Sequence, residues 1–270
     1  MNLVTTGVII VAVLLALLLV GRVGLQVQPA PFPPLAGPTA APETIPLPEG
    51  LPPPVDRFYR TLYGSDLPLI ESAAISGRGT MRIGGITFPA RFRFTHETWR
   101  NYRHDIENTF FGLPAMKVNE YYINGTARLE LPFGTASGPK IDQGANLALW
   151  AEAIWMPAVW ATDPRVHFEP ADEHAAELVV PFGNTEERIT LRFDPKTALL
   201  REMQSMRYRG EESEKKTLWV NEVREWSRID GWLLPRTIAV AWGDEASPWA
   251  VFTAEEVAYN GEEPPGTDEV

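Results

Sequence analysis

The apolar segment at residues 142–162, DQGANLALWAEAIWMPAVWAT, is the feature around which the predicted fold is organised. After Asp142 its only formal charge is Glu152, and bulky apolar side chains occur on several faces of the predicted helix instead of one. A helix that is apolar on nearly all sides is normally buried in protein or in lipid. We therefore predict one long central helix that the remainder of the domain encloses.

The two ends of this helix carry their own signals. Asp142 belongs to the residue types that commonly cap a helix N-terminus, so we place the start of the helix there. Pro157 lacks a backbone donor and crowds the preceding turn. The last turns should therefore be kinked or shortened.

Period-two alternation predicts strands on both sides of the central helix. The clearest case is residues 86–95, where apolar and polar residues alternate strictly, as in a half-buried strand. Pro89 lies on the polar face of this strand and suggests a sheet edge or a bulge. Asn124-Gly125 is a strong hairpin signal. Further strands are predicted at residues 102–108, 116–123, 127–131, 166–169, 177–182, 188–194, 200–208, 217–226, 236–242 and 249–259.

Many strands joined by short turns predict an antiparallel meander, because the chain shows no regular alternation of strand and helix. A twisted sheet of about ten strands tends to curl and to leave a concave apolar face. The predicted class is mainly β (α+β): a curved antiparallel meander sheet, or half-barrel, wrapped around one long central helix and preceded by a transmembrane helix.

The first residues predict a membrane anchor. Residues 3–25 are almost entirely apolar and, at about 1.5 Å per residue, can cross a hydrocarbon core of roughly 30 Å. A cleaved signal peptide is the alternative, but no Lys or Arg precedes the apolar core. We predict an uncleaved, single-pass anchor in the cytoplasmic membrane. Arg22 alone flanks it, so orientation is poorly specified by charge.

Domain boundaries follow from composition. We predict a transmembrane anchor at residues 1–27, a Pro-rich linker at 28–54, a curved-sheet domain at 55–260 that opens with a short helix, and a disordered tail at 261–270. The linker contains eleven prolines and favours polyproline II, a semi-rigid spacer that would hold the domain clear of the membrane. This arrangement favours a domain outside the cytoplasm.

Charge and cysteine content exclude several classes of function. The net charge of −11, without a dense basic run, argues against nucleic acid as a partner, since phosphates would be repelled. The chain has no cysteine, which excludes disulfides, thiol catalysis, cysteine-based zinc sites and a lipid-modified cysteine.

Three segments carry a resemblance to a known family: Gln143–Pro157 with Gly144, Leu147, Glu152 and Trp155, the turn Phe193–Thr197, and Asp230–Pro235. In these residues the chain resembles an uncharacterised family of bacterial membrane-anchored proteins, over roughly residues 52–260. That family has no established activity, so the resemblance implies no reaction. More distantly, the layout is similar to the incurved half-barrel of lipoprotein carriers of the LolA and LolB type, which hold acyl chains between sheet and helices. That likeness is architectural only.

Enzyme motifs give little support for catalysis. The sequence has no G-x-S-x-G elbow, no Walker A motif and no complete G-x-G-x-x-G. We predict no cofactor, and whether the chain is an enzyme stays open, with the balance against.

The best polar constellation is formed by His96, Glu97, His104 and Asp105. With a hairpin turn near residues 100–101, His96 would face Asp105 and Glu97 would face His104. Such a set could bind a divalent metal or act as acid and base. Oppositely charged pairs across strands are also a routine stabilising feature. These four residues are therefore weak metal candidates, and no metal site is predicted.

Glu152 is the charged residue inside the apolar helix. A buried carboxylate needs a partner, a proton or water, and the strand residues Arg91, Arg93, Arg192 and Arg207 are candidate partners. One interpretation is a structural salt bridge from helix to sheet. The other is a polar handle that orients a headgroup or an amine in an apolar pocket.

Two principal functions fit these patterns. The first is a membrane-tethered binding module for an apolar ligand, a lipid or lipoprotein acyl chain, held between sheet and helix. The alternative is a structural or interaction protein of the cell envelope with a packed core and no ligand. A hydrolase or metal enzyme using the His96 group has the least support. The candidate lining residues for a ligand are Phe92, Phe94, Trp150, Ile154, Trp155 and Trp160.

Overall fold

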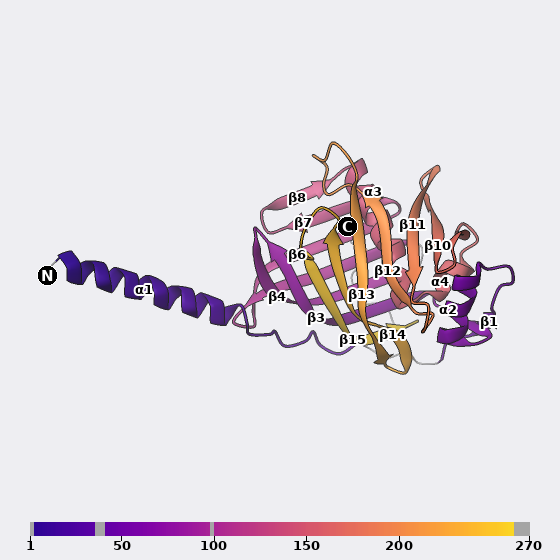
Figure 1. Cartoon of the computed structure of the whole chain (residues 1–270), viewed down its shortest axis with the longest axis horizontal. Coiled ribbons are helices and arrows are strands. Elements are labelled where there is room, and N and C mark those ends of the chain that lie inside the picture. The colour runs from indigo at the N-terminus through magenta and orange to yellow at the C-terminus, as the bar shows by residue number, and fades with distance from the viewer. Residues whose placement is uncertain (1–2, 36–40, 98–99, 262–270) are drawn as a thin grey trace.

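In the computed structural model, which describes residues 3–35, 41–97 and 100–261, one antiparallel sheet dominates the molecule (Figure 1). Its thirteen strands lie in the order β8-β7-β6-β5-β4-β3-β15-β14-β13-β12-β11-β10-β9. Along the chain, the first half of the sheet runs from the middle to one edge, and the second half runs from the other edge back to the middle. The first strand of the sheet, β3, therefore pairs with the last, β15. Apart from Gly261, the predicted disordered tail lies outside the described residues.

Each half of the sheet is a simple meander. The first half consists of β3 (Ser72–Ile83), β4 (Ile86–Glu97), β5 (Asn101–Phe110), β6 (Leu113–Ile123), β7 (Thr126–Leu131) and β8 (Gly134–Ser137). The second half consists of β9 (His167–Asp172), β10 (Ala175–Phe182), β11 (Thr185–Phe193), β12 (Leu200–Arg207), β13 (Thr217–Ile229), β14 (Trp232–Trp242) and β15 (Ala250–Tyr259). A separate small sheet pairs β1 (Thr44–Pro46) with β2 (Asp66–Pro68).

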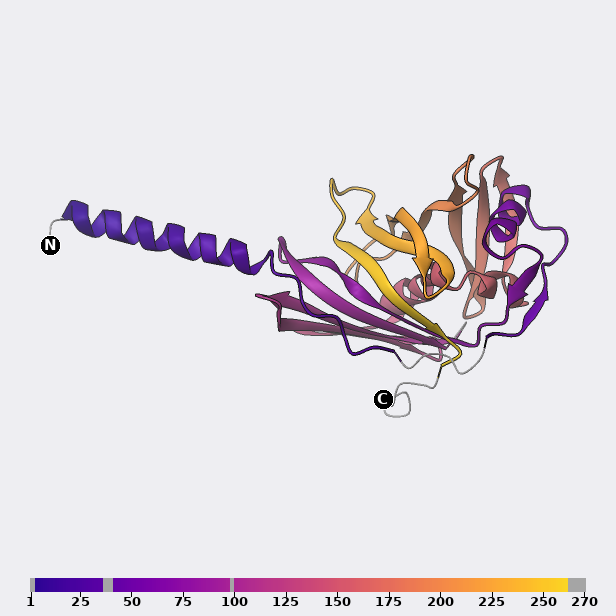
Figure 2. The ribbon, with the colours of Figure 1, turned by 90° about the horizontal axis from the view of Figure 1, so that it is seen from below.

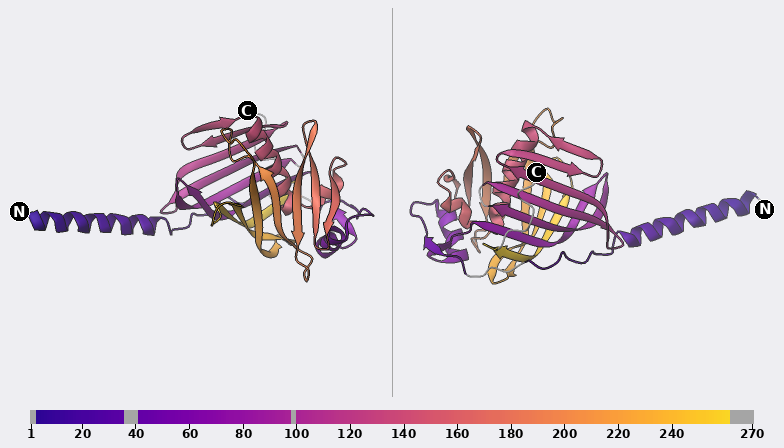
Figure 3. Two further views of the ribbon diagram at one scale, coloured as in Figure 1. Left: turned by 45° about the horizontal axis from the view of Figure 1, so that its top comes forward. Right: turned by 180° about the vertical axis from the view of Figure 1, so that it is seen from behind.

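The central helical segment connects the two halves and lies in the concave side of the bent sheet (Figures 2 and 3). It comprises α3 (Pro139–Glu152), the short 3-10 helix η1 (Ala153–Trp155) and α4 (Ala158–Thr162). Ten residues of α3 are buried, on several of its faces. The predicted fold class, a curved antiparallel meander wrapped around a buried helix, is therefore confirmed.

Two details of the predicted helix need correction or refinement. The helix begins at Pro139 after Gly138, three residues before the predicted cap. The Asp142 carboxylate instead accepts a hydrogen bond from the backbone N–H of Ala127, at 2.6 Å, and so ties the first turn of α3 to β7. The break near Pro157 is as predicted, because the helix resumes only at Ala158.

Two tyrosine hydroxyls donate hydrogen bonds to backbone carbonyls at the break. Tyr59, from α2 (Pro53–Tyr63), donates to the carbonyl of Pro157 at 2.7 Å. Tyr259, at the end of β15, donates to the carbonyl of Trp155. Both tyrosines are buried. The Pro157 carbonyl also accepts a hydrogen bond from the backbone N–H of Trp160 at 3.1 Å. Since a buried carbonyl without a partner is costly, these hydrogen bonds allow the interruption to lie in the core.

Local turn signals were accurate, whereas one strand register was not. Asn124-Gly125 and Asp230-Gly231 both adopt positive φ at their hairpin turns. Pro89 lies in an interior strand rather than at a sheet edge, next to the β5 bulge at residues 108–109 where β4–β5 pairing ends. The β4–β5 register pairs His96 with Tyr102, not with Asp105. Glu97 pairs with Asn101 and not with His104, so the turn lies earlier in the chain than predicted and every cross-strand partner shifts by three residues.

The N-terminal segment differs from a free spacer. α1 (Leu3–Gly24) is long and apolar enough to cross a membrane, as either an anchor or a signal sequence. The chain then runs along the outer face of β4, where Arg91 donates to the carbonyls of Ala30 and Pro31. Phe32 lies 4.5 Å from the Arg91 guanidinium. Proline has a backbone carbonyl but no backbone N–H. The carbonyls of this Pro-rich segment accept hydrogen bonds from the strand arginines.

Candidate functional site

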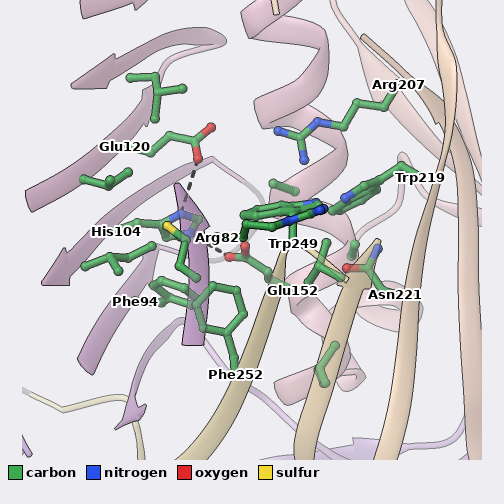
Figure 4. Close-up of a pocket in the computed structure, with 18 of the residues that line it drawn as sticks. Arg82, Phe94, His104, Glu120, Glu152, Arg207, Trp219, Asn221, Trp249 and Phe252 are labelled. Atoms are coloured by element: carbon green, nitrogen blue, oxygen red, sulfur yellow. Dashed lines mark hydrogen bonds and ion pairs between the residues drawn. The ribbon is translucent and has the colours of Figure 1, made fainter. Parts of the chain in front are cut away.

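The cavity between the sheet and the central helical segment is the candidate site. Its volume is about 390 Å³, within the range of roughly 300–1,000 Å³ that small-molecule pockets occupy. β3 to β7 contribute one wall, β12 to β15 contribute the other, and α3 with η1 forms the side between them. Most of its lining is apolar, with a small number of charged side chains (Figure 4).

The predicted lining residues fall into two groups. Phe94, Ile154 and Trp155 line the cavity. Phe92, Trp150 and Trp160 are buried outside the cavity lining, in the core around it. Trp160 donates its indole N–H to the carbonyl of Trp150 at 2.8 Å, which joins α4 to α3. Whether any of the six contacts a ligand stays a prediction.

The mouth of the cavity lies at one end of the strands. Ile83, at the end of β3, and Phe133, between β7 and β8, both line it. Trp242 and Trp249, on either side of the β14–β15 connection, line it as well. In an antiparallel order these connections lie at the same end of the sheet. The opening is therefore framed by hairpin turns.

Glu152, the predicted polar handle, lies at the polar floor of the cavity. Its Oε2 atom lies 2.7 Å from Nε2 of His104 and 3.3 Å from Nε2 of His96. The side chain is 18% exposed, whereas both histidines are buried. The candidate arginine partners do not form an ion pair with Glu152 in the described part of the chain. Two histidines from β4 and β5 take that place.

The charged groups of this cluster shift one another's pKa values. Burial alone lowers the pKa of His104, but the negative charges of Glu152 and Glu120 and their hydrogen bonds outweigh it and raise the pKa to about 9. Burial raises the pKa of Glu152, and the two histidines more than reverse this, to about 2. Burial keeps the pKa of His96 below its usual value. At neutral pH the cluster is therefore an imidazolium–carboxylate pair beside a neutral histidine.

The other two candidates, Glu97 and Asp105, lie apart from this cluster. Side chains alternate across a strand, so these odd-numbered residues project to the face opposite His96 and His104. Glu97 accepts a hydrogen bond from Asn101 at 2.6 Å, and Asp105 forms an ion pair with Arg103 at 3.0 Å. The predicted pairing of His96 with Asp105 and of Glu97 with His104 was wrong because the hairpin turn lies earlier in the chain than residues 100–101.

Glu120 on β6 is a functional candidate that sequence reasoning missed. Its carboxylate lies 3.5 Å from Nδ1 of His104 and accepts a hydrogen bond from the Tyr102 hydroxyl at 2.9 Å. The alternation in β6 contained the signal, because Val118 and Tyr122 are buried and Glu120 lies on the same face between them. A carboxylate at an inward position predicts a buried partner.

Arg207, at the end of β12, presents a cation to the same cavity (Figure 4). Its guanidinium lies 4.7 Å from the Trp219 ring centre, and its buried Nε has no hydrogen-bond partner among the described residues. Gly144 on α3 makes room for it, because a Cβ at that position would lie 2.8 Å from Nε. The other lining arginines, Arg82 and Arg209, are each paired with Glu245.

The family model described as a family of unknown function, DUF6544, matches residues 42–254. This chain belongs to that family. A comparison with curated proteins found no match.

Solved structures with a similar fold are distant in sequence. A DUF1329 family protein from Desulfovibrio piger is 13% identical, with a TM-score of 0.42 over 72% of this chain and 88% of that chain. A LolA superfamily protein from Nitrosomonas europaea is 8% identical, with a TM-score of 0.45 over 78% of this chain and 93% of that chain.

Proposed function

We propose that this DUF6544 protein is a membrane-tethered binding module that holds the apolar chain of an amphiphile, such as a lipid or a lipoprotein acyl chain, between the curved sheet and the central helical segment. The observation that carries the proposal is the 390 Å³ cavity and its largely apolar lining. Protein interiors are normally close-packed, with few voids larger than a water molecule. An apolar space of this size at the centre of the domain favours a ligand over a packed core.

The lining of the site supports a ligand with an apolar chain and one polar end. Apolar side chains such as Phe94, Val118 and Ile238 line the walls. Ligand sites of this kind combine a mostly apolar surface with a few polar groups that fix orientation. The apolar chain gains free energy by leaving water, at roughly 25 cal/mol per Å² of surface buried.

Arg207 supports an anionic group at the polar end of that ligand. It is a half-buried cation in the cavity without an ion pair to any described residue, held in position by Trp219 and by the space above Gly144. A guanidinium binds carboxylates and phosphates through paired N–H donors. We infer a fatty acid or an anionic lipid headgroup as the ligand chemistry. Glu152, already neutralised by His104, would then be a neighbour of the headgroup and not its main contact.

The position of α1 supports the membrane as the source of this amphiphile. The backbone N–H of Phe111, in the β5–β6 turn, donates to the carbonyl of Gly24 at 2.9 Å, so the end of α1 abuts the hairpin turns at the mouth. Large apolar residues are exposed on three of these turns; Phe133 is 89% exposed and Leu113 is 69% exposed. Ile86, Phe111 and Leu131 are exposed beside them. We call Ile86, Phe111, Leu113, Leu131 and Phe133 the apolar rim.

The apolar rim and α1 together argue for an opening that faces the bilayer. A cluster of exposed apolar side chains marks an interaction surface rather than a solvated one. A membrane surface is the partner that α1 would bring to the same end of the sheet. An acyl chain could then move between the bilayer and the cavity without crossing water.

Native mass spectrometry of the full-length protein, purified from membranes in a mild detergent, tests this proposal. We expect a population whose mass exceeds that of the chain by the mass of one lipid or fatty acid. Ala148 lines the cavity from α3, and Ala148→Phe should reduce this population, whereas Ala148→Ser, which nearly preserves the volume, should retain it. A protein that never carries a lipid, even after incubation with oleate or anionic phospholipid, would refute the proposal and favour an envelope structural protein.

A further inference from the structure

Three ligand-type atoms converge at the polar floor of the cavity. One ring nitrogen of His96, one ring nitrogen of His104 and a carboxylate oxygen of Glu152 all lie within 4.8 Å of one another. The His96–Glu152 distance of 3.3 Å matches the roughly 3.3–3.5 Å between neighbouring ligand atoms around a tetrahedral zinc ion with bonds of about 2.0–2.2 Å. The His104–Glu152 pair, at 2.7 Å, would have to widen by about 0.6 Å to accept such an ion.

His96 is buried without a hydrogen bond of good geometry among the described residues. Its side chain is 1% exposed, and neither ring nitrogen has a hydrogen-bond partner among the described residues. Buried polar atoms are nearly always paired, and those that are not need a reason. Nε2 of His96 lies next to the same Glu152 carboxylate oxygen that Nε2 of His104 contacts. A metal ion bound between the three side chains would give that nitrogen a partner.

His104 has the surroundings of a metal ligand. Its ring lies between Phe94 and Tyr102, with centroid distances of 4.0 and 4.2 Å, which fix its plane. Glu120 lies 3.5 Å from the second ring nitrogen, Nδ1, and is itself held by the Tyr102 hydroxyl. Histidines that bind metals commonly donate the other ring N–H to a carboxylate, which orients the ring. Glu120 occupies that position.

The formal charge of the cluster also suits a dication. Glu120 and Glu152 are two partly buried carboxylates on either side of one histidine. A divalent ion that displaces the proton from His104 into solvent would balance both negative charges. Two nitrogen ligands select transition metals over magnesium and calcium, which prefer sites made of oxygen atoms.

We propose that His96, His104 and Glu152 form a binding site for a divalent transition metal ion, with zinc as the reference ion and Glu120 as the group that orients His104. Three protein ligands leave a coordination position open, and His104 and Glu152 line the cavity. The open position therefore faces the space that also contains Arg207. An oxygen of a bound water or of an anionic headgroup could complete the coordination.

Metal titration of the full-length protein in detergent, after removal of metal by a chelator and of lipid by washing, tests the site. Zinc titration by calorimetry should give one equivalent per chain, and cobalt should give visible absorption bands of a four-coordinate or five-coordinate site. Because the protein is delipidated, failure of this experiment does not bear on lipid binding, and failure to find lipid does not bear on the metal.

The decisive variant is His96→Gln. His96 is buried 3.3 Å from Glu152, so a merely structural role predicts a change in stability alone, whereas the metal site predicts loss of the stoichiometric zinc and of the cobalt bands. Glu120→Gln should weaken zinc binding by about 10–100-fold while keeping the stoichiometry. Thermal unfolding in the presence of chelator confirms that each variant folds.

A matched control is available in the exposed pair of His167 and Glu169, whose His167 Nε2 lies 3.6 Å from a Glu169 oxygen. His167→Ala should leave zinc stoichiometry and cobalt bands unchanged. The proposal is overturned if the parent protein binds no zinc at micromolar concentration, if His96→Gln retains the site, or if His167→Ala loses it.

Discussion

Nε2 of His104, on β5, lies 2.7 Å from Oε2 of Glu152, the last residue of α3. This contact joins the first half of the sheet to the end of the helix at the point where the cavity has its polar floor. Because Glu120 approaches the other nitrogen of the same ring, a single imidazole links β6, β5 and α3. The contact therefore fixes the depth at which α3 lies in the sheet.

Glu152→Gln should lower the free energy of unfolding of the chelator-treated protein. The substitution keeps the size of the side chain but removes the charge that His104 and His96 face, and loss of a buried charged partner costs about 1–3 kcal/mol. Denaturant unfolding followed by tryptophan fluorescence measures the change. Glu169→Gln, in an exposed pair with Arg188, is the control and should change little. Equal stabilities for the two variants would contradict a structural contribution from the His104–Glu152 pair.

Gly144→Ala should weaken binding of an anionic amphiphile while leaving the fold intact. Alanine is the better helix former, by about 0.8–1.0 kcal/mol, but its Cβ would lie 2.8 Å from Nε of Arg207 and must displace that flexible side chain. Titration with a fluorescent fatty acid measures affinity, and thermal unfolding reports on stability.

Arg207→Gln is the companion to that variant. A hydrogen bond to a charged group contributes about 1.5–3 kcal/mol, so affinity for the fluorescent fatty acid should fall by about tenfold or more. Binding of the corresponding uncharged alcohol should fall much less. If acid and alcohol lose affinity equally, Arg207 does not bind the headgroup.

Phe133 should contact the acyl region of the bilayer in the full-length protein. Since the chain has no cysteine, Phe133→Cys provides a unique site for an environment-sensitive fluorophore. Reconstituted in nanodiscs, the label should be quenched by lipids that carry a nitroxide on the acyl chain. Thr126→Cys, at the β6–β7 turn on the opposite end of the sheet, is the control and should be quenched little. Quenching of both labels to the same degree would exclude the proposed orientation.

Tyr59→Phe should destabilise the domain through the helix break. The hydroxyl donates to the Pro157 carbonyl at 2.7 Å. That carbonyl keeps the backbone N–H of Trp160 as a donor, so the expected loss is one buried hydrogen bond, about 0.5–1.5 kcal/mol. Denaturant unfolding measures the loss. Thr61→Ala on the same helix removes an exposed hydroxyl that bonds within α2 and should change the free energy of unfolding less. The reverse order would show that the break needs no cap from Tyr59.

Local patterns predicted the fold well because each strand and turn is specified by neighbouring residues. The alternation around Phe92 and Phe94 predicted β4, and Asn124-Gly125 predicted its hairpin through the need for positive φ. The register of β4 and β5 was wrong because it depends on the position of one turn. A shift of that turn moves Asp105 and Glu97 to different partners on the opposite face.

The candidate site was only partly predictable because it depends on how far the sheet bends. Glu152 was recognised as a charge that needs a partner, but its histidines come from strands about fifty residues away in sequence. Gly144 and Arg207 likewise meet only when β12 lies over α3. Their approach is a property of the tertiary packing, and local sequence carries no signal for it.

Photocrosslinking with a fatty acid that carries a diazirine near the end of its chain tests the central claim most directly. After irradiation of the full-length protein in nanodiscs, peptide mapping should place the crosslinks on cavity residues such as Phe94, Val118, Ile154 and Ile238. The variant Ala148→Phe, in the same experiment, should remove these crosslinks. Crosslinks confined to α1 and the apolar rim, with none in the cavity, would contradict a lipid-binding role for the space between sheet and helix.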